Sequence, residues 1–203
     1  MAGTNLDAPF GLRPYNLLGG AANSTGLTSY LVQVNGTAGS SSAIYQGDMV
    51  IPLTNGLVDV SAADGGSVAI LGVMAGCQYV NTSGETVFAN NYPGTSSLKS
   101  DSEARVFVYD NPHQVYEVKA DASLTDIATA TALIHSNAEG ANFGSQNGST
   151  GISIGEISVA TAGATTATDN FRIVGIKDPF DEIDVTSAGV KLNLPFHTAT
   201  TGL

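Results

Sequence analysis

The sequence predicts a mainly β protein: a sandwich or barrel-like body of short antiparallel strands, with one short helix and an extended N-terminal arm. Its 203 residues include 24 glycines and 7 prolines, a composition that favours many short strands joined by turns. Charged residues make up only 12% of the chain, whereas helical bundles use Glu and Lys heavily. Apolar segments recur about every 8–12 residues, a spacing typical of sandwiches and barrels. Because both architectures use the same alternation, the sequence does not separate them.

The expected division is an extended arm over residues 1–24, a single β-rich domain over residues 25–196 and a frayed tail over residues 197–203. The arm contains Pro9 and Pro14 and shows neither helical nor strand periodicity. Each proline holds the residue before it in extended geometry. The arm is too apolar for a solvated linker, so we expect it to lie along a surface of its own domain or of a partner.

Five strands are expected in the first half of the chain: Leu27–Val34, Asp48–Leu53, Leu57–Val60, Val68–Val80 and Glu85–Ala89. Asn55-Gly56 is a strong hairpin signal between two of them, and Pro52 indicates a strand edge or end. Gly72 and Gly76 suit a bulged or sharply bent central strand. We expect an exposed loop over residues 90–102.

The clearest pattern runs from Ala104 to Ala120. Two β-branched and aromatic segments, Arg105–Tyr109 and Gln114–Lys119, read as strands. Asp110-Asn111-Pro112 separates them, and we expect a tight turn there because Asp and Asn bond their own backbone and Pro lacks an N–H. The expected core residues of this region are valines: Val106, Val108, Val115 and Val118.

The one helix signal begins at Ser123–Asp126, which resembles a capping box. We expect a short helix over Leu124–Ala130 and then a strand over Thr131–His135, with one longer helix to His135 as the alternative. Asn137–Gly151 is rich in Gly, Ser and Asn and predicts a flexible loop. The remaining expected elements are strands at Ile152–Val159, Asn170–Ile176 and Gly189–Leu194, and a turn at Asp178–Glu182.

Charge and cysteine content exclude several classes of function. The formal net charge of -11 disfavours direct binding of nucleic acid. Cys77 is the single cysteine, so no internal disulfide can form, which fits a reducing compartment or an assembly made inside a cell. The N-terminus lacks the features of a signal peptide, and no segment approaches the ~20 apolar residues that span a bilayer. We therefore expect neither a nucleic-acid nor a membrane partner.

No group of residues predicts a catalytic, cofactor-binding or metal site. Cys77 lies in an apolar segment, where a thiol is inert, and the histidines are scattered, with no nucleophile motif beside them. Metal-binding pairs such as His-x-x-x-His and Cys-x-x-Cys are missing. Four acidic residues cluster at 178–184, but without EF-hand spacing a solvated acidic turn is favoured over a calcium site. The chain is therefore not expected to be an enzyme.

Five short segments follow one another in a distinctive order: Asn5–Pro14, Gly47–Val50, Gly72–Tyr79, Val108–Pro112 and Phe171–Gly175. This series resembles the capsid cement, or head-decoration, proteins of tailed bacteriophages. It extends over most of the chain. Two parts depart from the family pattern, the loop at residues 137–151 and the tail from Pro195 onward.

The resemblance implies a non-enzymatic virion protein, often a homotrimer, that sits on the capsid exterior and clamps neighbouring capsomers. Its partners would be the major capsid protein and further copies of itself, after synthesis in the cytoplasm of the bacterial host. The arm would lie on the shell or on a sister subunit. We expect Phe10, Leu12, Arg13 and Tyr15 to bind the partner, since aromatic residues and Arg dominate interface energetics. The alternative is that they pack on their own domain.

Two other functions stay open from the sequence. One is a tail or fibre component of the virion. The other is a small β-sandwich module that binds carbohydrate or mediates adhesion. Such a module needs an exposed aromatic platform, and in a chain without Trp the candidates are tyrosines: Tyr79, Tyr92, Tyr109 and Tyr116.

Overall fold

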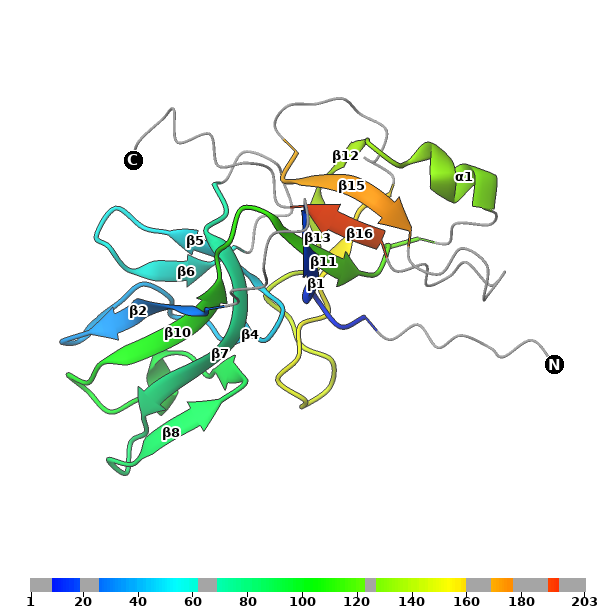
Figure 1. The fold of residues 1–203 in the computed structure, drawn as a ribbon. Coiled ribbons are helices and arrows are strands. Elements are labelled where there is room, and N and C mark those ends of the chain that lie inside the picture. The colour runs from blue at the N-terminus through cyan, green and yellow to red at the C-terminus, as the bar shows by residue number, and fades with distance from the viewer. Residues whose placement is uncertain are drawn as a thin grey trace.

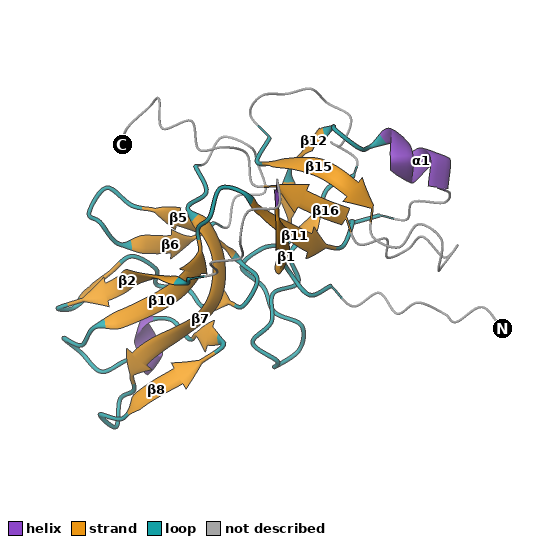
Figure 2. Ribbon diagram, viewed as in Figure 1, coloured by secondary structure: helices purple, strands orange, loops and turns teal. Residues whose placement is uncertain are grey.

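The computed structural model describes residues 9–18, 26–61, 69–122, 127–159, 169–176 and 190–193. Over these residues the protein is mainly β, with several antiparallel sheets in a sandwich-like arrangement and one short α-helix (Figures 1 and 2). The predicted mainly β, sandwich-like fold with one short helix is confirmed, whereas residues 1–8 and 19–24 of the expected N-terminal arm lie outside the described residues. The expected capping box at Ser123–Asp126, the turn at Asp178–Glu182 and the tail over 197–203 lie outside the described residues.

The larger sheet has seven strands in the order β3-β2-β10-β7-β5-β6, with β8 paired to β7. Their bounds are β2 Thr28–Val34, β3 Thr37–Ala38, β5 Met49–Pro52, β6 Val58–Val60, β7 Gly72–Val80, β8 Thr86–Ala89 and β10 Ala104–Tyr109. Each strand predicted in the first half of the chain is present. Asn55-Gly56 forms the expected turn between β5 and β6, with Gly56 at a φ of 80°.

The second sheet has five strands in the order β1-β11-β16-β15-β12. Their bounds are β1 Arg13–Leu17, β11 Gln114–Val118, β12 Asn137–Ala138, β15 Phe171–Ile176 and β16 Val190–Asn193. Two small sheets complete the fold: β4 Ile44–Tyr45 with β9 Asn91–Tyr92, and β13 Gly140–Ala141 with β14 Glu156–Ile157. A 3-10 turn, η2, covers Thr95–Ser97, and the helix α1 covers Ile127–Ala132.

The segment from Ala104 to Ala120 links the two large sheets (Figure 1). Both predicted strands exist, but β10 joins the seven-stranded sheet and β11 joins the five-stranded one. The turn between them therefore changes the sheet rather than closing a hairpin. The four expected core valines, Val106, Val108, Val115 and Val118, are all buried.

β7 is the central, bulged strand that its glycines predicted. It pairs along one side with β10 and along the other with β5 and β8. Its register against β10 shifts between Phe107, opposite Gly76, and Val108, opposite Met74. A Cβ on Gly72 would lie only 2.3 Å from the Tyr109 carbonyl oxygen, so this close approach of two strands requires glycine.

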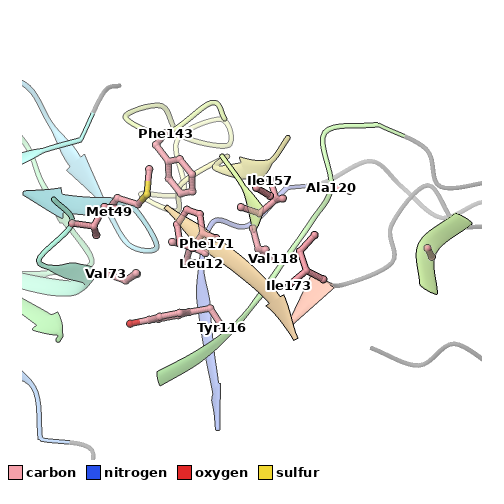
Figure 3. Packing of buried hydrophobic residues seen from close by; sticks show 13 residues of the cluster. Leu12, Met49, Val73, Tyr116, Val118, Ala120, Phe143, Ile157, Phe171 and Ile173 are labelled. Carbon is pink, nitrogen blue, oxygen red and sulfur yellow. The ribbon is translucent and has the colours of Figure 1, made fainter. Parts of the chain in front are cut away.

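A hydrophobic cluster connects the two large sheets. Met49 of β5 and Val73 of β7 belong to it, together with Tyr116 of β11 and Phe171 of β15. Figure 3 shows Phe143, Phe171 and Leu12 gathered between Met49 and Val73 on one side and Ile157, Val118 and Ile173 on the other. A second cluster, around Val32, Met74, Tyr92 and Val106, packs within the seven-stranded sheet and the short strands beside it.

Residues 90–102 are not the exposed loop that the sequence predicted. They contain β9 and η2. Tyr92 is fully buried, with its hydroxyl donating to the Ser40 carbonyl oxygen at 3.2 Å, and Leu98 is also buried. The Ser- and Asn-rich composition suggested exposure, but the two apolar side chains in this segment pack into the second cluster.

The prediction around the helix is also corrected. α1 ends at Ala132 and a turn follows, so neither the strand over Thr131–His135 nor the longer helix to His135 forms. His135 has a left-handed φ of 75°, a conformation that ends regular structure. The next strand is β12, inside the segment 137–151 that we predicted to be a loop, and β13 also lies there.

The structure places part of the expected arm in the body of the protein. β1 pairs antiparallel with β11, and the Gln114 side-chain amide donates to the Asn16 carbonyl oxygen at 3.0 Å. Beyond the strand, the Leu18 N–H donates to the His113 carbonyl oxygen at 2.9 Å. Residues 13–17 are therefore a strand of the five-stranded sheet and not a separate arm.

Candidate partner-binding surface and loop junction

The four residues expected to bind a partner do not share one environment. Leu12 is only 2% exposed and belongs to the cluster between the sheets. Its backbone N–H donates to the Gly47 carbonyl oxygen at 3.0 Å. For Leu12 the expectation of partner binding is wrong and the alternative holds, because its apolar side chain is removed from water by its own chain.

Phe10, Arg13 and Tyr15 remain at the surface to different degrees. Phe10 is half-buried, Arg13 is exposed and Tyr15 is 48% exposed. The guanidinium carbon of Arg13 lies 4.2 Å from the centre of the Phe10 ring, a cation–π contact worth about 0.5–1 kcal/mol at an exposed site. We name these three residues the β1 patch.

A partner that binds at β1 would contact its side chains, because the backbone of β1 is unsuited to pairing with another strand. It is the last strand in the order of its sheet. Pro14 lacks an N–H, and the register against β11 shifts between Pro14 and Asn16, which leaves Tyr15 as the bulged residue. Prolines and bulges are common features that block pairing at the edge of a sheet.

A fully buried carboxylate, Asp48, holds several loops together. Its Oδ1 accepts hydrogen bonds from the Ser153 hydroxyl at 2.5 Å and the Gly144 N–H at 3.0 Å. Its Oδ2 accepts a hydrogen bond from the Tyr45 N–H at 2.8 Å. Burial raises the pKa of Asp48, and these three hydrogen bonds oppose that rise because they favour the charged form.

The chain segments around Asp48 approach each other closely through glycines. A Cβ on Gly11 would lie 2.8 Å from Cβ of Ser153. Gly47 donates its N–H to the Met74 carbonyl oxygen at 2.9 Å, and Met74 donates to the Asp48 carbonyl oxygen at 2.9 Å. We call Gly11, Gly47, Asp48, Gly144 and Ser153 the loop junction.

Contacts at and beside the loop junction join four short segments of the chain: Asn5–Pro14, Gly47–Val50, Gly72–Tyr79 and Val108–Pro112. The first segment meets the second where Leu12 bonds to Gly47, and the second meets the third where Asp48 bonds to Met74. The third meets the fourth where the backbone of Gly72 lies against the Tyr109 carbonyl oxygen. Segments that are far apart in the sequence thus lie in contact in the folded protein.

The single cysteine, Cys77, is buried and its thiol is inaccessible. Cys77 is 1% exposed and its thiol donates to the Asn91 carbonyl oxygen at 3.0 Å. Burial raises the pKa of Cys77 to about 12, so the thiol stays protonated and unreactive at neutral pH. Within the described residues no three His, Cys, Asp or Glu side chains gather where they could hold a metal ion. The acidic residues at 178–184 lie outside the described part of the chain.

The four tyrosines proposed for a carbohydrate platform do not form one. Tyr92 and Tyr116 are fully buried. Tyr79 and Tyr109 are partly buried and pack against the two hydrophobic clusters. The large apolar side chains that are exposed in the described residues are different ones: Tyr15, Leu27 and Phe88.

Two residues of interest, Asp48 and Phe88, were missed by sequence reasoning. Asp48 stands directly before the apolar strand β5 and after a glycine, which is a weak sign of a buried acid at a tight turn. Phe88 lies in a strand that the alternation located correctly, but alternation alone does not say which face meets solvent.

Comparison of the chain with protein-family models, characterised proteins and solved structures finds no match. Among the helices that the structure describes, none has both the length and the apolar character needed to cross a membrane.

Proposed function

We propose that this protein is a capsid cement, or head-decoration, protein of a tailed bacteriophage. The observation that carries the proposal is the ordered series of five segments that resembles this family. The structure supports it in that four of these segments contact in series, the first with the second, the second with the third and the third with the fourth.

In this role the protein would sit on the capsid exterior as a homotrimer and bind the major capsid protein. Several modest contacts on one oligomer act together, because after the first contact forms the others bind at high effective concentration. A mainly β body of several antiparallel sheets suits such a role.

The β1 patch is the surface that we propose for contact with the capsid. Arg and aromatic side chains are the residue types that most often dominate binding energy. Arg13 stacked on Phe10 is a pre-ordered pair, so less side-chain entropy is lost when a partner covers it. Tyr15 is on the same edge strand as Arg13, two residues along, and is 48% exposed.

The test is co-sedimentation of the purified protein with capsids that lack it. We expect saturable binding by the wild type and a loss of affinity of about 10- to 100-fold for the double variant Arg13→Ala, Tyr15→Ala, on the scale of two interface residues. Leu27→Ala is the matched control, since Leu27 is 44% exposed but lies outside the β1 patch.

Substitution is preferable to truncation, because removing residues 1–18 would also remove buried Leu12 and strand β1. Failure of the wild type to bind capsids would overturn the proposal. Loss of the protein from particles that have been stripped of tails would assign it instead to a tail or fibre.

A further inference from the structure

Three asparagines in this chain are followed directly by glycine, at Asn35-Gly36, Asn55-Gly56 and Asn147-Gly148, and all six residues are exposed. In such a pair the backbone nitrogen of the glycine can attack Cγ of the asparagine side chain, because no Cβ on the glycine hinders its approach. Ammonia leaves, and water then opens the five-membered succinimide ring to aspartate or isoaspartate. The sequence motif is the same in all three pairs, whereas their conformations in the folded protein differ.

The first pair is held in a backbone conformation that is unsuited to this reaction. Asn35 and Gly36 form a two-residue loop between β2 and β3, closed by the pairing of Val34 with Thr37. Their φ angles of 48° and 76° are typical of a type I′ turn. The succinimide ring closes only when the glycine nitrogen lies on the same side as Cβ of the asparagine. A left-handed backbone, with ψ about +30 to +60°, turns that nitrogen to the opposite side.

In the second pair hydrogen bonds engage both reacting groups. The Gly56 N–H, which carries the attacking nitrogen, donates to the Leu53 carbonyl oxygen at 3.1 Å. The side-chain Oδ1 of Asn55 accepts a hydrogen bond from the Leu57 N–H at 3.0 Å, and such a bond from a side chain to its own turn fixes the orientation of the amide. Both bonds must open before the ring can close.

In the third pair the backbone of the asparagine is anchored, but the reacting groups are not. The Asn147 N–H donates to the Ile152 carbonyl oxygen at 3.0 Å, and the Asn147 carbonyl oxygen accepts from the Thr150 N–H at 3.3 Å. Among the described residues, no hydrogen bond engages the Asn147 side chain or the Gly148 N–H. Asn147 does not have a positive φ, and a Cβ on Gly148 would meet nothing within 4 Å. The amide therefore has room to turn toward the glycine nitrogen.

We propose that Asn147 is a site of spontaneous deamidation, and that in the folded protein it reacts ahead of Asn55 and Asn35. The product carries one more negative charge. Where isoaspartate forms, the backbone gains a methylene group next to the hydrogen bond from residue 147 to Ile152, which in turn bridges to Gln46. The modification would therefore loosen this loop slowly as the protein ages.

This inference goes beyond the proposed function and does not rest on it. It concerns the purified protein without capsids, so its failure is distinguishable from a failure of capsid binding.

The first experiment follows deamidation of the folded wild type in warm, mildly alkaline buffer, with protease digestion and mass spectrometry at several times. Conversion of the amide to an acid raises the mass of the peptide that contains it. We expect Asn147 to convert at least about 10-fold faster than Asn55, the scale for two hydrogen bonds that must open before reaction. Asn35 should also lag behind Asn147. Conversion of Asn55 or Asn35 as fast as Asn147 would overturn the proposal.

The same incubation in concentrated guanidinium chloride tests whether the fold sets this order. Unfolding removes the left-handed turn at Asn35 and the two hydrogen bonds at the Asn55-Gly56 pair, so the three rates should converge. An order that persists unchanged in the unfolded chain would show that neighbouring residues set it, which contradicts a structural origin.

The matched variant is Gly148→Ala. Its methyl group hinders attack by the nitrogen, and the open space around Gly148 accommodates it without a clash. We expect deamidation of Asn147 to slow several-fold, with the rates at Asn35 and Asn55 unchanged. An unchanged rate at Asn147 would mean that its amide is lost without attack by the neighbouring nitrogen, and would contradict the proposed reaction.

Discussion

The β5–β6 hairpin and the loop junction are built in opposite ways. The hairpin turn lies within five consecutive residues, 53–57, where the Leu53 N–H donates to the Leu57 carbonyl oxygen at 2.8 Å, and a side chain added at Gly56 would meet nothing within 4 Å. The junction is closed by residues as distant as Asp48 and Ser153, which are 105 positions apart. The conformation of the hairpin therefore depends on its own turn residues, whereas the loop junction depends on close packing between segments that are remote in sequence. Substitutions should be costly at the junction and mild at the hairpin.

The largest loss of stability is expected at Phe143, the aromatic ring beside the junction. Its ring fills the space next to Gly140 and Gly155, where an added Cβ would approach it to 2.7 and 2.1 Å. Phe143→Ala should lower the free energy of unfolding by about 4 kcal/mol, through lost burial and the cavity that remains. Urea denaturation measures this change. Phe88→Ala, at an exposed phenylalanine, is the control and should change stability by less than about 0.5 kcal/mol. Equal losses for the two variants would contradict the packing described for Phe143.

The second largest loss of stability is expected for Gly72→Ala. The new methyl group would collide with the Tyr109 carbonyl oxygen and with the Val108 side chain at 2.6 Å, so β7 and β10 must move apart. We expect a loss of about 3 kcal/mol, the upper end for overpacking of a core. The measurement is the urea midpoint and slope. A midpoint like that of the wild type would show that β7 and β10 do not approach so closely.

Asp48 should make stability depend on pH. Its pKa is raised in the folded state by burial, so the folded protein binds the proton more tightly than the unfolded chain does. The stability contributed by this group is full below the unfolded pKa and is lost as pH rises through the folded pKa. Asp48→Asn removes this titration. Asparagine cannot accept all three hydrogen bonds, which costs about 1–2 kcal/mol.

Urea titrations of wild type and Asp48→Asn between about pH 4 and pH 7 measure the effect as a difference. We expect the advantage of the wild type over the variant to shrink as pH rises. Glu85→Gln, at an exposed carboxylate, controls for the loss of one negative charge. A difference that grows with pH would mean that hydrogen bonds outweigh burial at Asp48.

The smallest effect is expected at the hairpin. Gly56 has a φ of 80° and open space around it. Gly56→Ala should therefore lower the free energy of unfolding by about 1 kcal/mol, because alanine disfavours the left-handed backbone conformation. Gly56→Asn should lose less, because Asn tolerates this conformation. Thermal unfolding of both variants checks the order. If Gly56→Ala were as damaging as Gly72→Ala, the contrast between hairpin and junction would be wrong.

The sequence located most strands because strand formation leaves a local pattern. Alternation and turn residues placed β2, β5, β7, β10 and β15 close to their observed bounds. The same reasoning failed where burial depended on distant partners. Residues 90–102 and 137–151 look like polar loops, yet Tyr92 and Phe143 are drawn into the two clusters.

The candidate site, too, was predictable from the sequence only in part. The sequence picked out the residue types of the β1 patch, but it could not tell exposed Arg13 from buried Leu12, one residue away. Asp48 gave almost no signal, because a buried acid is recognised by the donors around it, and those come from residues 45, 144 and 153.

By itself the sequence determined the β class, the turns at Asn55-Gly56 and Asp110–Pro112, and the bulged central strand, because each depends on backbone preferences of neighbouring residues. Tertiary structure alone decided that β10 and β11 enter different sheets, that β1 joins β11 and that Asp48 is enclosed. Those outcomes depend on which remote segments can bury apolar surface together and satisfy each other's polar groups, and no local pattern encodes that choice.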